Sequence, residues 1–274
     1  MKEMSIGVFT SVGAGLGASL DFVKELALDN VQLHTPPPEA RSPERTQELK
    51  KQFEDADIAI TVVFAGFAGE SYASIPVVKD TVGLVPAKTR KARLKETFEI
   101  SDWTRAMGCD ALGMHIGFIP EDTKNRVHKE LVKVARDVCD YCADNGQRFH
   151  LETGQETADG LLAFIEDVGR DNLAVNFDPA NMILYGTGEP LPALRKIGSF
   201  VKSVHCKDAK WSDDPGVAWG TEMPLGEGEV DIPLFIFTLK EIGYLGPLTI
   251  EREVPGEQQK TDIRNAVELL RTLR

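Results

Sequence analysis

The chain has 274 residues, of which 42% are hydrophobic, and a formal net charge of −12 at pH 7. Nucleic-acid binding relies on lysine and arginine side chains that neutralise phosphates, so this charge argues against a nucleic-acid partner. No run approaches the roughly 18 apolar residues of a membrane span, and the opening MKEMSIGVFT leads directly into strand-like sequence. We therefore expect a cytoplasmic protein that binds neither membranes nor nucleic acid, and the composition leaves homo-oligomerisation open.

Short β-branched or apolar runs alternate with longer amphipathic runs along the whole chain, which is typical of βα units around a parallel sheet. Eight strands are predicted, at residues 5–10, 30–35, 58–67, 111–117, 148–153, 173–179, 201–208 and 247–253. The helix patterns between them span 20–29, 42–57, 91–108, 128–146, 160–169, 193–198 and 232–243. Several of these patterns stop at a glycine, as helix C-termini tend to.

The spacing of these elements favours a closed barrel. Eight strands in 274 residues give about 34 residues per βα unit, the usual size in a (β/α)8 or TIM barrel. No proline-rich or polar linker divides the chain. We therefore assign residues 1–274 to one α/β domain, a single (β/α)8 TIM barrel.

The alternative architecture is an open, doubly wound sheet with a nucleotide-binding loop. Gly13, Gly15 and Gly17 follow the first strand, where glycines can cradle a pyrophosphate. The third glycine position of the dinucleotide fingerprint is missing, and the second strand ends in His34 instead of a ribose-binding acid. We therefore treat this segment as a flexible loop. Two longer connections, residues 65–89 and 209–231, follow predicted strand ends and are expected to act as lids or binding loops.

The four cysteines are too few for a disulfide scaffold in a chain of this length. Cys139 and Cys142 form a CxxC, but they lie within a predicted helix and have no second pair. We expect them to be core residues on a helix face.

Acidic and histidine side chains occur at the carboxyl ends of four successive predicted strands. Glu152, Asp178 and His205 are spaced by 26 and 27 residues, one βα unit each, and Glu251 follows after the long seventh connection. All strands of a (β/α)8 barrel open onto the same face at their carboxyl ends, so these four side chains are expected to converge. Each acid alone is equally compatible with a helix cap or a loop position.

Three converging carboxylates repel one another unless a cation or protons neutralise them, and a metal ion is the simplest answer. Oxygen-rich ligands with a single imidazole suit Mn²⁺, Mg²⁺ or Co²⁺ better than a structural zinc. Cys206 is adjacent to His205 and should therefore point to the opposite face of its strand.

The motifs at these strand ends resemble a known superfamily. They are LE at 151–152, FDPAN at 177–181, HCKD at 205–208, LGEGEVD at 225–231 and IERE at 250–253. Together they resemble the xylose isomerase-like TIM-barrel superfamily, which includes ketose 3-epimerases, inosose-processing enzymes and endonuclease-IV-type proteins. The resemblance covers the whole chain and is more specific for fold and metal site than for substrate.

The resemblance to ketose 3-epimerases implies roles for the four strand-end residues. Glu152, Asp178, His205 and Glu251 would bind a divalent metal, with Mn²⁺ the first choice and Mg²⁺, Co²⁺ or Zn²⁺ as alternatives. Glu152 and Glu251 would also be catalytic, because the matching glutamates exchange a proton on opposite faces of the sugar carbon. The epimerases carry a histidine where this chain has Asn181, an amide that does not titrate near neutral pH.

Further residues near the strand ends are candidates for substrate binding, each with a structural alternative such as a satisfied core group or an ion pair. They are His34, His115, Glu156, Asn181 and Lys207. His150 is expected one layer deeper in the barrel, supporting the site, whereas His128 on a helix flank is expected to be exposed to solvent.

The leading hypothesis is a divalent-metal-dependent sugar isomerase or epimerase acting on a small carbohydrate or polyol-derived ketone. It would abstract a proton next to the carbonyl through a metal-stabilised enediolate. The alternative is a lyase or dehydratase of the same superfamily, acting on an inosose or a 3-keto-glycoside. An endonuclease would need more histidine ligands and a basic face, and a sensor without turnover remains a further alternative.

Overall fold

The computed structural model describes residues 4–12 and 17–274, and eight parallel strands form its centre. The barrel strands are β1 (Ile6–Ser11), β2 (Asn30–His34), β3 (Ala59–Phe64), β4 (Ala111–Met114), β5 (Arg148–Glu152), β6 (Leu173–Phe177), β7 (Val201–Cys206) and β10 (Leu248–Ile250). They close in the order β1-β10-β7-β6-β5-β4-β3-β2. All eight predicted strands and the TIM-barrel fold are confirmed, and the open sheet is excluded.

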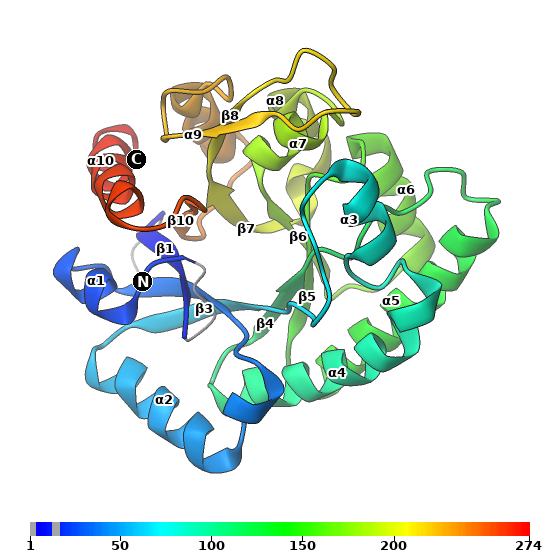
Figure 1. Cartoon of the computed structure of the whole chain (residues 1–274), viewed down its shortest axis with the longest axis horizontal. Coiled ribbons are helices and arrows are strands. Elements are labelled where there is room, and N and C mark those ends of the chain that lie inside the picture. Colours follow the sequence, from blue (N-terminus) through cyan, green and yellow to red (C-terminus); the bar gives the residue numbers. More distant parts are fainter. Residues whose placement is uncertain (1–3, 13–16) are drawn as a thin grey trace.

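Helices surround the strands as an outer ring (Figure 1). They are α1 (Leu20–Glu25), α2 (Pro43–Asp55), α3 (Ile75–Thr81), α4 (Ala87–Ala106), α5 (Arg126–Asp144), α6 (Ala158–Val168), α7 (Pro179–Tyr185), α8 (Pro190–Ile197), α9 (Ile232–Glu241) and α10 (Glu257–Leu273). Two short 3₁₀ helices span Pro38–Ala40 and Gly198–Phe200. The seven predicted helices are confirmed, whereas α3, α7 and α10 were not predicted. Among the described residues, no helix is long and apolar enough to cross a membrane.

Side chains alternate along each strand between the barrel interior and the layer beneath the helices. Val204 and Cys206 belong to the large apolar core that the helices cover, whereas His205 between them faces inward. The predicted orientation of Cys206 is therefore confirmed. The interior is apolar near β1 and β3, where Phe9 and Phe64 pack together, and polar near β2, β5, β6 and β7.

The cysteine pair of α5 is part of the apolar core, as predicted. Cys139 and Cys142 are fully buried, and burial raises the pKa of each thiol to about 12. His128 on the same helix is fully buried, so the expectation that it is exposed was wrong. Its ring nitrogens contact the Pro120 carbonyl at 2.7 Å and Asp167 Oδ2 at 2.9 Å. These two partners satisfy an imidazole that the helix pattern alone placed in solvent.

The connection after β3 contains α3 and is held in place by hydrogen bonds from Arg93 and to Glu70. Arg93 on α4 is buried and donates to the carbonyls of Thr81 at 2.6 Å and Gly83 at 2.8 Å. The Glu70 carboxylate accepts from the Gly83 amide at 2.7 Å. Gly17 lies at the end of the glycine-rich first loop, but Gly13 and Gly15 are outside the described residues.

The connection after β7 contains a small antiparallel hairpin of β8 (Asp208–Lys210) and β9 (Thr221–Met223). Asp208 holds the returning chain, because its carboxylate accepts from the backbone amides of Ala209, Gly226, Gly228 and Val230 at 2.9–3.1 Å. A Cβ atom at Gly228 would lie 2.2 Å from Asp208 Oδ1, so this close approach requires glycine. The ring of Trp219 packs 4.5 Å from that of Tyr185 on α7, which anchors the hairpin over the strand ends.

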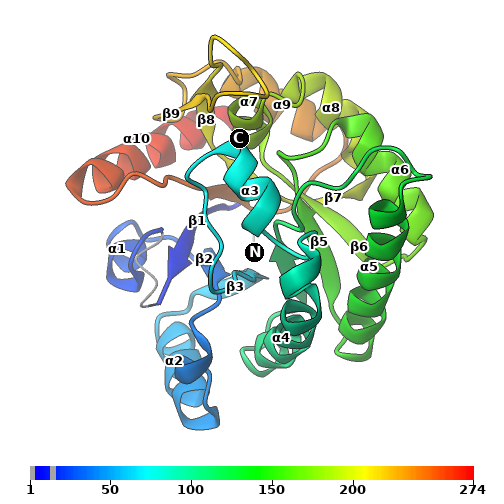
Figure 2. The same cartoon turned by 45° about the vertical axis from the view of Figure 1, so that its right-hand side comes forward.

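Segments far apart in the sequence lie side by side where the barrel closes. In Figures 1 and 2, α10 lies beside α1. Arg264 on α10 forms an ion pair with Glu25 at 2.6 Å and lies over the ring of Phe22, 4.9 Å from its centroid.

Candidate metal centre

The four predicted strand-end residues meet at one point. Glu152 is the last residue of β5 and His205 the penultimate residue of β7, while Asp178 directly follows β6 and Glu251 directly follows β10. One ligand atom from each lies within 4.8 Å of the others. Asp178 and His205 are fully buried, and Glu152 and Glu251 are nearly so. The convergence that the strand spacing predicted is therefore present in the structure.

Asp178 has two roles that its two carboxylate oxygens divide between them. Oδ1 accepts from the Asn181 backbone amide at 2.9 Å and caps the N-terminus of α7. Oδ2 is buried and has no hydrogen-bond partner among the described residues. The helix-cap alternative raised from the sequence is therefore correct for one oxygen, and the other oxygen is available to a metal ion.

His205 Nδ1 is the other buried atom whose surroundings indicate a cation. It lies 2.7 Å from Glu152 Oε1, 3.3 Å from Glu251 Oε2 and 3.5 Å from Asp178 Oδ2. None of these contacts is aligned as a hydrogen bond among the described residues. A nitrogen and three carboxylates that share one small space fit the donor set of a divalent ion.

The pKa shifts of His205 and Glu152 show that the cluster stabilises a positive charge at its centre. Burial lowers the pKa of His205, but the charges of Glu251 and Glu152 outweigh it and raise that pKa well above 6.5. Burial likewise opposes ionisation of Glu152, yet His115 and His205 lower its pKa to about 2. A metal ion would replace the proton on His205, because an imidazole ligand must be neutral on the ligating nitrogen.

Lys207 supplies a fixed positive charge beside the four residues. Its side chain is only 1% exposed, and Nζ lies 2.9 Å from Glu251 Oε2 and also contacts Glu253. Nζ donates to Asn181 Oδ1 at 3.4 Å and is 3.9 Å from Asp178 Oδ2. Lys207 and Asn181 therefore adjoin the four-residue cluster, although Lys207 pairs closely with only one of its three carboxylates.

Three other predicted substrate-binding residues lie around the same strand ends. His115 Nε2 is 3.0 Å from Glu152 Oε2, so it contacts a cluster residue directly. Glu156 is buried and accepts from the Ile119 amide at 3.0 Å, and its burial raises its pKa to about 8. His34 ends β2, where burial lowers its pKa. His150 lies deeper and contacts Ser203 Oγ at 2.8 Å, in the interior position expected for it.

The sequence interpretation missed Gln32 on β2. Its Oε1 lies 2.7 Å from His205 Nε2, on the side of the imidazole away from the carboxylates. A glutamine between two buried apolar residues, Val31 and Leu33, is unusual in the interior of a strand. This pattern could have indicated that Gln32 has a polar partner inside the barrel.

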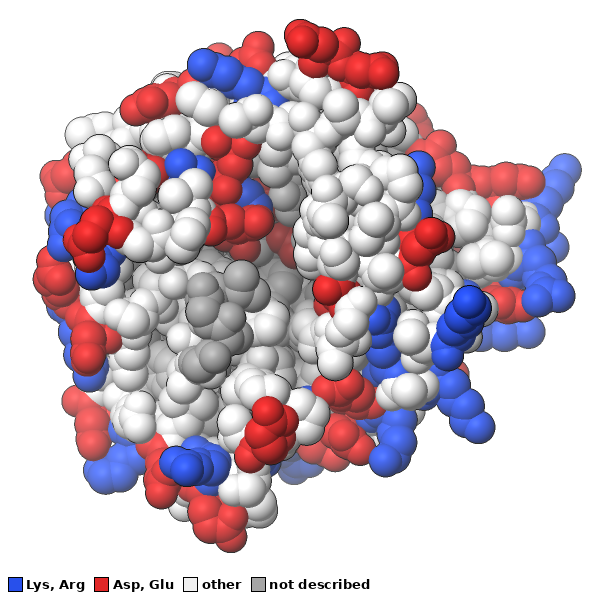
Figure 3. Space-filling view, viewed as in Figure 1, with Lys and Arg blue, Asp and Glu red and all other residues white. Residues whose placement is uncertain are grey.

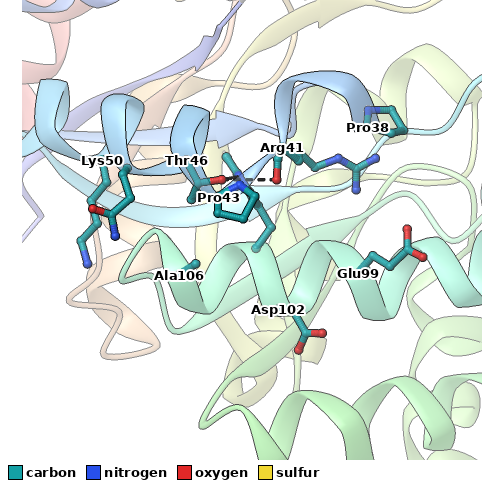
Figure 4. A pocket seen from close by; sticks show the side chains of 10 residues that line it. Pro38, Arg41, Pro43, Thr46, Lys50, Glu99, Asp102 and Ala106 are labelled. Carbon is teal, nitrogen blue, oxygen red and sulfur yellow. Dashed lines mark hydrogen bonds between the residues drawn. The ribbon is translucent and has the colours of Figure 1, made fainter.

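A hollow of about 480 Å³ also lies outside the barrel, between α2 and α4 (Figure 4). Its size suits a small ligand, but several of its polar side chains already have partners. Arg41 pairs with Glu96 at 2.5 Å, and Asp102 accepts from Tyr141 at 2.8 Å. Trp103 donates to Thr46 at 3.0 Å. The hollow lacks the converging, unpartnered ligand atoms that distinguish the strand-end cluster.

Acidic side chains also border a hollow near the centre of the face that Figure 1 presents, as the space-filling view in Figure 3 shows. A negative rim attracts cations and repels anions. The surface charge therefore has the sign that a cation site requires.

Comparison with solved structures supports the fold. A xylose isomerase domain protein from Planctomyces limnophilus is 52% identical, with a TM-score of 0.97, and the match covers 99% of this chain and 98% of that one. A D-psicose 3-epimerase from Clostridium cellulolyticum H10, solved with D-tagatose, is 18% identical with a TM-score of 0.74, and 98% and 99% are covered. The probable 3-DHS dehydratase AsbF from Bacillus anthracis is 14% identical with a TM-score of 0.71 and the same coverage. At such low identity the last two show a shared fold alone.

The family itself is established by sequence. The family model described as "Xylose isomerase-like TIM barrel" matches residues 20–273, nearly the whole chain. The resemblance seen in the strand-end motifs is therefore confirmed. Proteins with this fold include sugar epimerases and a probable dehydratase. With its closed eight-stranded barrel and its buried Glu–Asp–His–Glu cluster, this chain belongs to the xylose isomerase-like TIM barrel family.

Proposed function

We propose that the protein is a divalent-metal-dependent isomerase or epimerase of a small sugar or polyol-derived ketone. The observation that supports this most is the convergence of Glu152, Asp178, His205 and Glu251, with ligand atoms within 4.8 Å of one another. Asp178 Oδ2 and His205 Nδ1 are among the buried side-chain atoms that have no hydrogen-bond partner in the described residues, and a bound ion would give both of them a partner. The oxygen-rich set favours Mn²⁺, with Mg²⁺, Co²⁺ or Zn²⁺ as alternatives.

A divalent ion held by these residues would stabilise the negative charge that develops when a carbon next to a carbonyl loses its proton. Glu152 and Glu251 then serve as the acid and base pair. The charges of His205 and Lys207 keep the pKa of Glu251 well below 4.5 despite its burial, so this carboxylate is ionised and can accept a proton. Glu152 is ionised as well, because its pKa is lowered to about 2, so the proton that it delivers to the other side of the substrate carbon must come from a neighbour. His115, whose Nε2 lies 3.0 Å from Glu152 Oε2 and whose pKa is raised mainly by the charge of Glu152 against the opposing effect of burial, is placed to supply it.

The remaining polar side chains would orient the substrate. Lys207 and Asn181 offer donors on one side of the cluster, and His115 adjoins Glu152 on another. We assign His34 and Glu156 to substrate oxygens as well. Glu156 remains protonated near neutral pH and can therefore donate a hydrogen bond.

The second candidate is a lyase that uses the same site. Asn181 occupies the position where ketose 3-epimerases carry a titratable histidine, and the structural likeness extends to a probable dehydratase. After the same proton abstraction, such an enzyme would expel water or an aglycone from the neighbouring carbon. Release of that fragment distinguishes it from an epimerase.

The test is incorporation of solvent deuterium into a panel of ketoses, inososes and 3-keto-glycosides in the presence of Mn²⁺. We expect label at the carbon next to the carbonyl, and Glu251→Gln should reduce its incorporation by a factor of 100 or more. Glu227→Gln is the matched control, because it changes an exposed carboxylate in the connection after β7, and it should behave as the unaltered protein does. Absence of label across the whole panel would refute the enzymatic proposal.

A further inference from the structure

Gln32 spans the barrel interior from β2 to β6 and β7. Its Oε1 lies 2.7 Å from His205 Nε2, and its Nε2 donates to Asn176 Oδ1 at 3.3 Å and to the Val204 carbonyl at 3.4 Å. The side chain is 1% exposed, and the partners are separated from it by 144 to 173 residues in the chain. A single amide thus connects three strands directly beneath the cluster.

The Val204 carbonyl fixes the orientation of this amide. A backbone carbonyl only accepts hydrogen bonds, so the NH₂ group of Gln32 must face it and the oxygen must face His205. An oxygen in that position accepts a hydrogen bond from the Nε2–H group of His205. The lone pair of a neutral imidazole is then on Nδ1, the nitrogen that lies among Glu152, Asp178 and Glu251.

The strand register changes at both amide residues. The pairing of β2 with β3 shifts between Val31 and Gln32, and the pairing of β6 with β7 shifts between Val175 and Asn176. Such irregularities redirect side chains and occur next to active sites. Gln32 and Asn176 are thus placed at the two points where the barrel departs from regular pairing.

We propose that Gln32 is a positioning residue of the metal centre: its carbonyl oxygen holds the Nε2 proton of His205 and so presents the Nδ1 lone pair to the ion. This inference rests on the proposed function, because it assumes that the cluster binds a metal. Gln32 contacts Nε2 of His205, whereas Nδ1 lies among the carboxylates, so the effect of Gln32 on the ion would be indirect. Its contribution is to fix the ring orientation of His205 and to keep the proton on Nε2 when the ion takes the place of the proton on Nδ1.

The test measures the Mn²⁺ dissociation constant of the whole protein by calorimetry. Gln32→Leu removes the acceptor and should weaken binding about 10- to 100-fold. Gln32→Glu keeps an oxygen for the Nε2 proton and should stay within a few-fold of the unaltered protein. Ser203→Ala is the matched control, because it removes a different interior hydrogen bond, to His150, two residues before His205. It should leave the dissociation constant unchanged.

A second measurement reports the tautomer directly. In protein labelled with ¹⁵N-histidine and loaded with diamagnetic Zn²⁺, the NMR spectrum of His205 should show one set of signals, with Nε2 protonated. In Gln32→Leu we expect this single set of signals to be lost. Should Gln32→Leu fail to fold, Gln32→Asn withdraws the oxygen by one methylene and is expected to have the same two effects.

The outcomes separate this inference from the function it rests on. If the unaltered protein does not bind Mn²⁺, the proposed function is wrong and this inference is overturned with it. If it binds Mn²⁺ but Gln32→Leu binds equally well with the same tautomer, the positioning role alone is overturned. Equal weakening by Ser203→Ala would also overturn it, because any lost interior hydrogen bond would then suffice.

Discussion

At the scale of single residues, Lys207 supplies positive charge that offsets the negative charge of the buried carboxylates when no metal is bound. A buried ammonium is stable only when opposite charges surround it, and Lys207 has Glu251 at 2.9 Å, Glu253 in contact and Asp178 at 3.9 Å. Burial alone would lower the pKa of Lys207, but these carboxylates raise it well above 10.5. The lysine and the carboxylates therefore stabilise one another.

Lys207→Met should destabilise the metal-free protein by about 3 to 5 kcal/mol, because it leaves buried carboxylates without their counter-charge. Thermal or urea unfolding at neutral pH measures the loss. Lys210→Met is the control, because it changes an exposed lysine three residues further along the chain, and it should have an effect of less than about 0.5 kcal/mol. Mn²⁺ should recover more stability in Lys207→Met than in the unaltered protein. Equal losses for the two lysines would show that Lys207 does not have this role.

Glu156 predicts a pH dependence of stability. Its folded-state pKa is raised from 4.5 to about 8, mainly by burial. Its contribution to stability is therefore complete below about pH 4.5 and is lost as the pH rises towards about 8. Relative to the unaltered protein, Glu156→Gln should gain stability across this range, on the order of 1 kcal/mol per pH unit at the steepest part. Melting temperatures measured from pH 5 to 9 test this, and a constant difference between the two proteins would contradict it.

At the scale of elements, the connection after β7 is organised by one carboxylate. Asp208 accepts from four backbone amides, three of which belong to the returning segment at residues 226–230. A hydrogen bond from a backbone amide to an ionised carboxylate is stronger than one between two neutral groups. These hydrogen bonds hold the returning segment in place, and the role of this connection as a lid or binding loop stays a prediction.

Asp208→Asn removes the charge and leaves an amide whose NH₂ group cannot accept from these backbone donors. We expect faster amide hydrogen exchange at residues 222–231, while exchange in β5 and β6 stays as it was. Hydrogen-exchange mass spectrometry resolves the two regions. Asp213→Asn changes an exposed carboxylate of the same connection and should have no such effect. Uniform protection in both variants would show that Asp208 is not required for this order.

At the scale of the whole molecule, a metal ion would couple the four strands that supply the cluster. Binding to the folded protein alone raises stability by about 2.7 kcal/mol at a concentration of 100 times the dissociation constant. We expect Mn²⁺ to raise the melting temperature by about 5 °C or more relative to protein treated with a chelator. Asp178→Asn should reduce this increment strongly. An unchanged melting temperature in Mn²⁺ would argue against a metal centre.

The barrel was predictable from the sequence because each strand is a compact apolar run followed by a polar residue. Glu152 and His205 could be placed because strand spacing fixes which residues reach the same barrel face. The helix α7 was missed because its seven residues begin with Pro179 immediately after Asp178, and so short a segment shows little periodicity. The helix α10 was not predicted, although Ile263, Ala266, Val267 and Leu270 are buried at the spacing of one helix face.

The rest of the site depends on contacts across the barrel that no local pattern encodes. Gln32 approaches His205 over 173 residues of chain, so the partner of neither could be read from its neighbours. His128 was misplaced for the same reason, because the Pro120 carbonyl and Asp167 that satisfy it come from other segments. Long-range pairing of polar groups is decided by the folded arrangement, which the alternation of apolar and polar residues does not specify.

The pairing of β1 with β10 has a consequence for how the protein is made. Ile6 pairs with Leu248, so β1 leaves the ribosome more than 240 residues before β10, the strand with which it pairs. Until then the nascent sheet has two open edges that can pair with other chains. Chaperones that shield such edges during translation should therefore improve the yield of native protein.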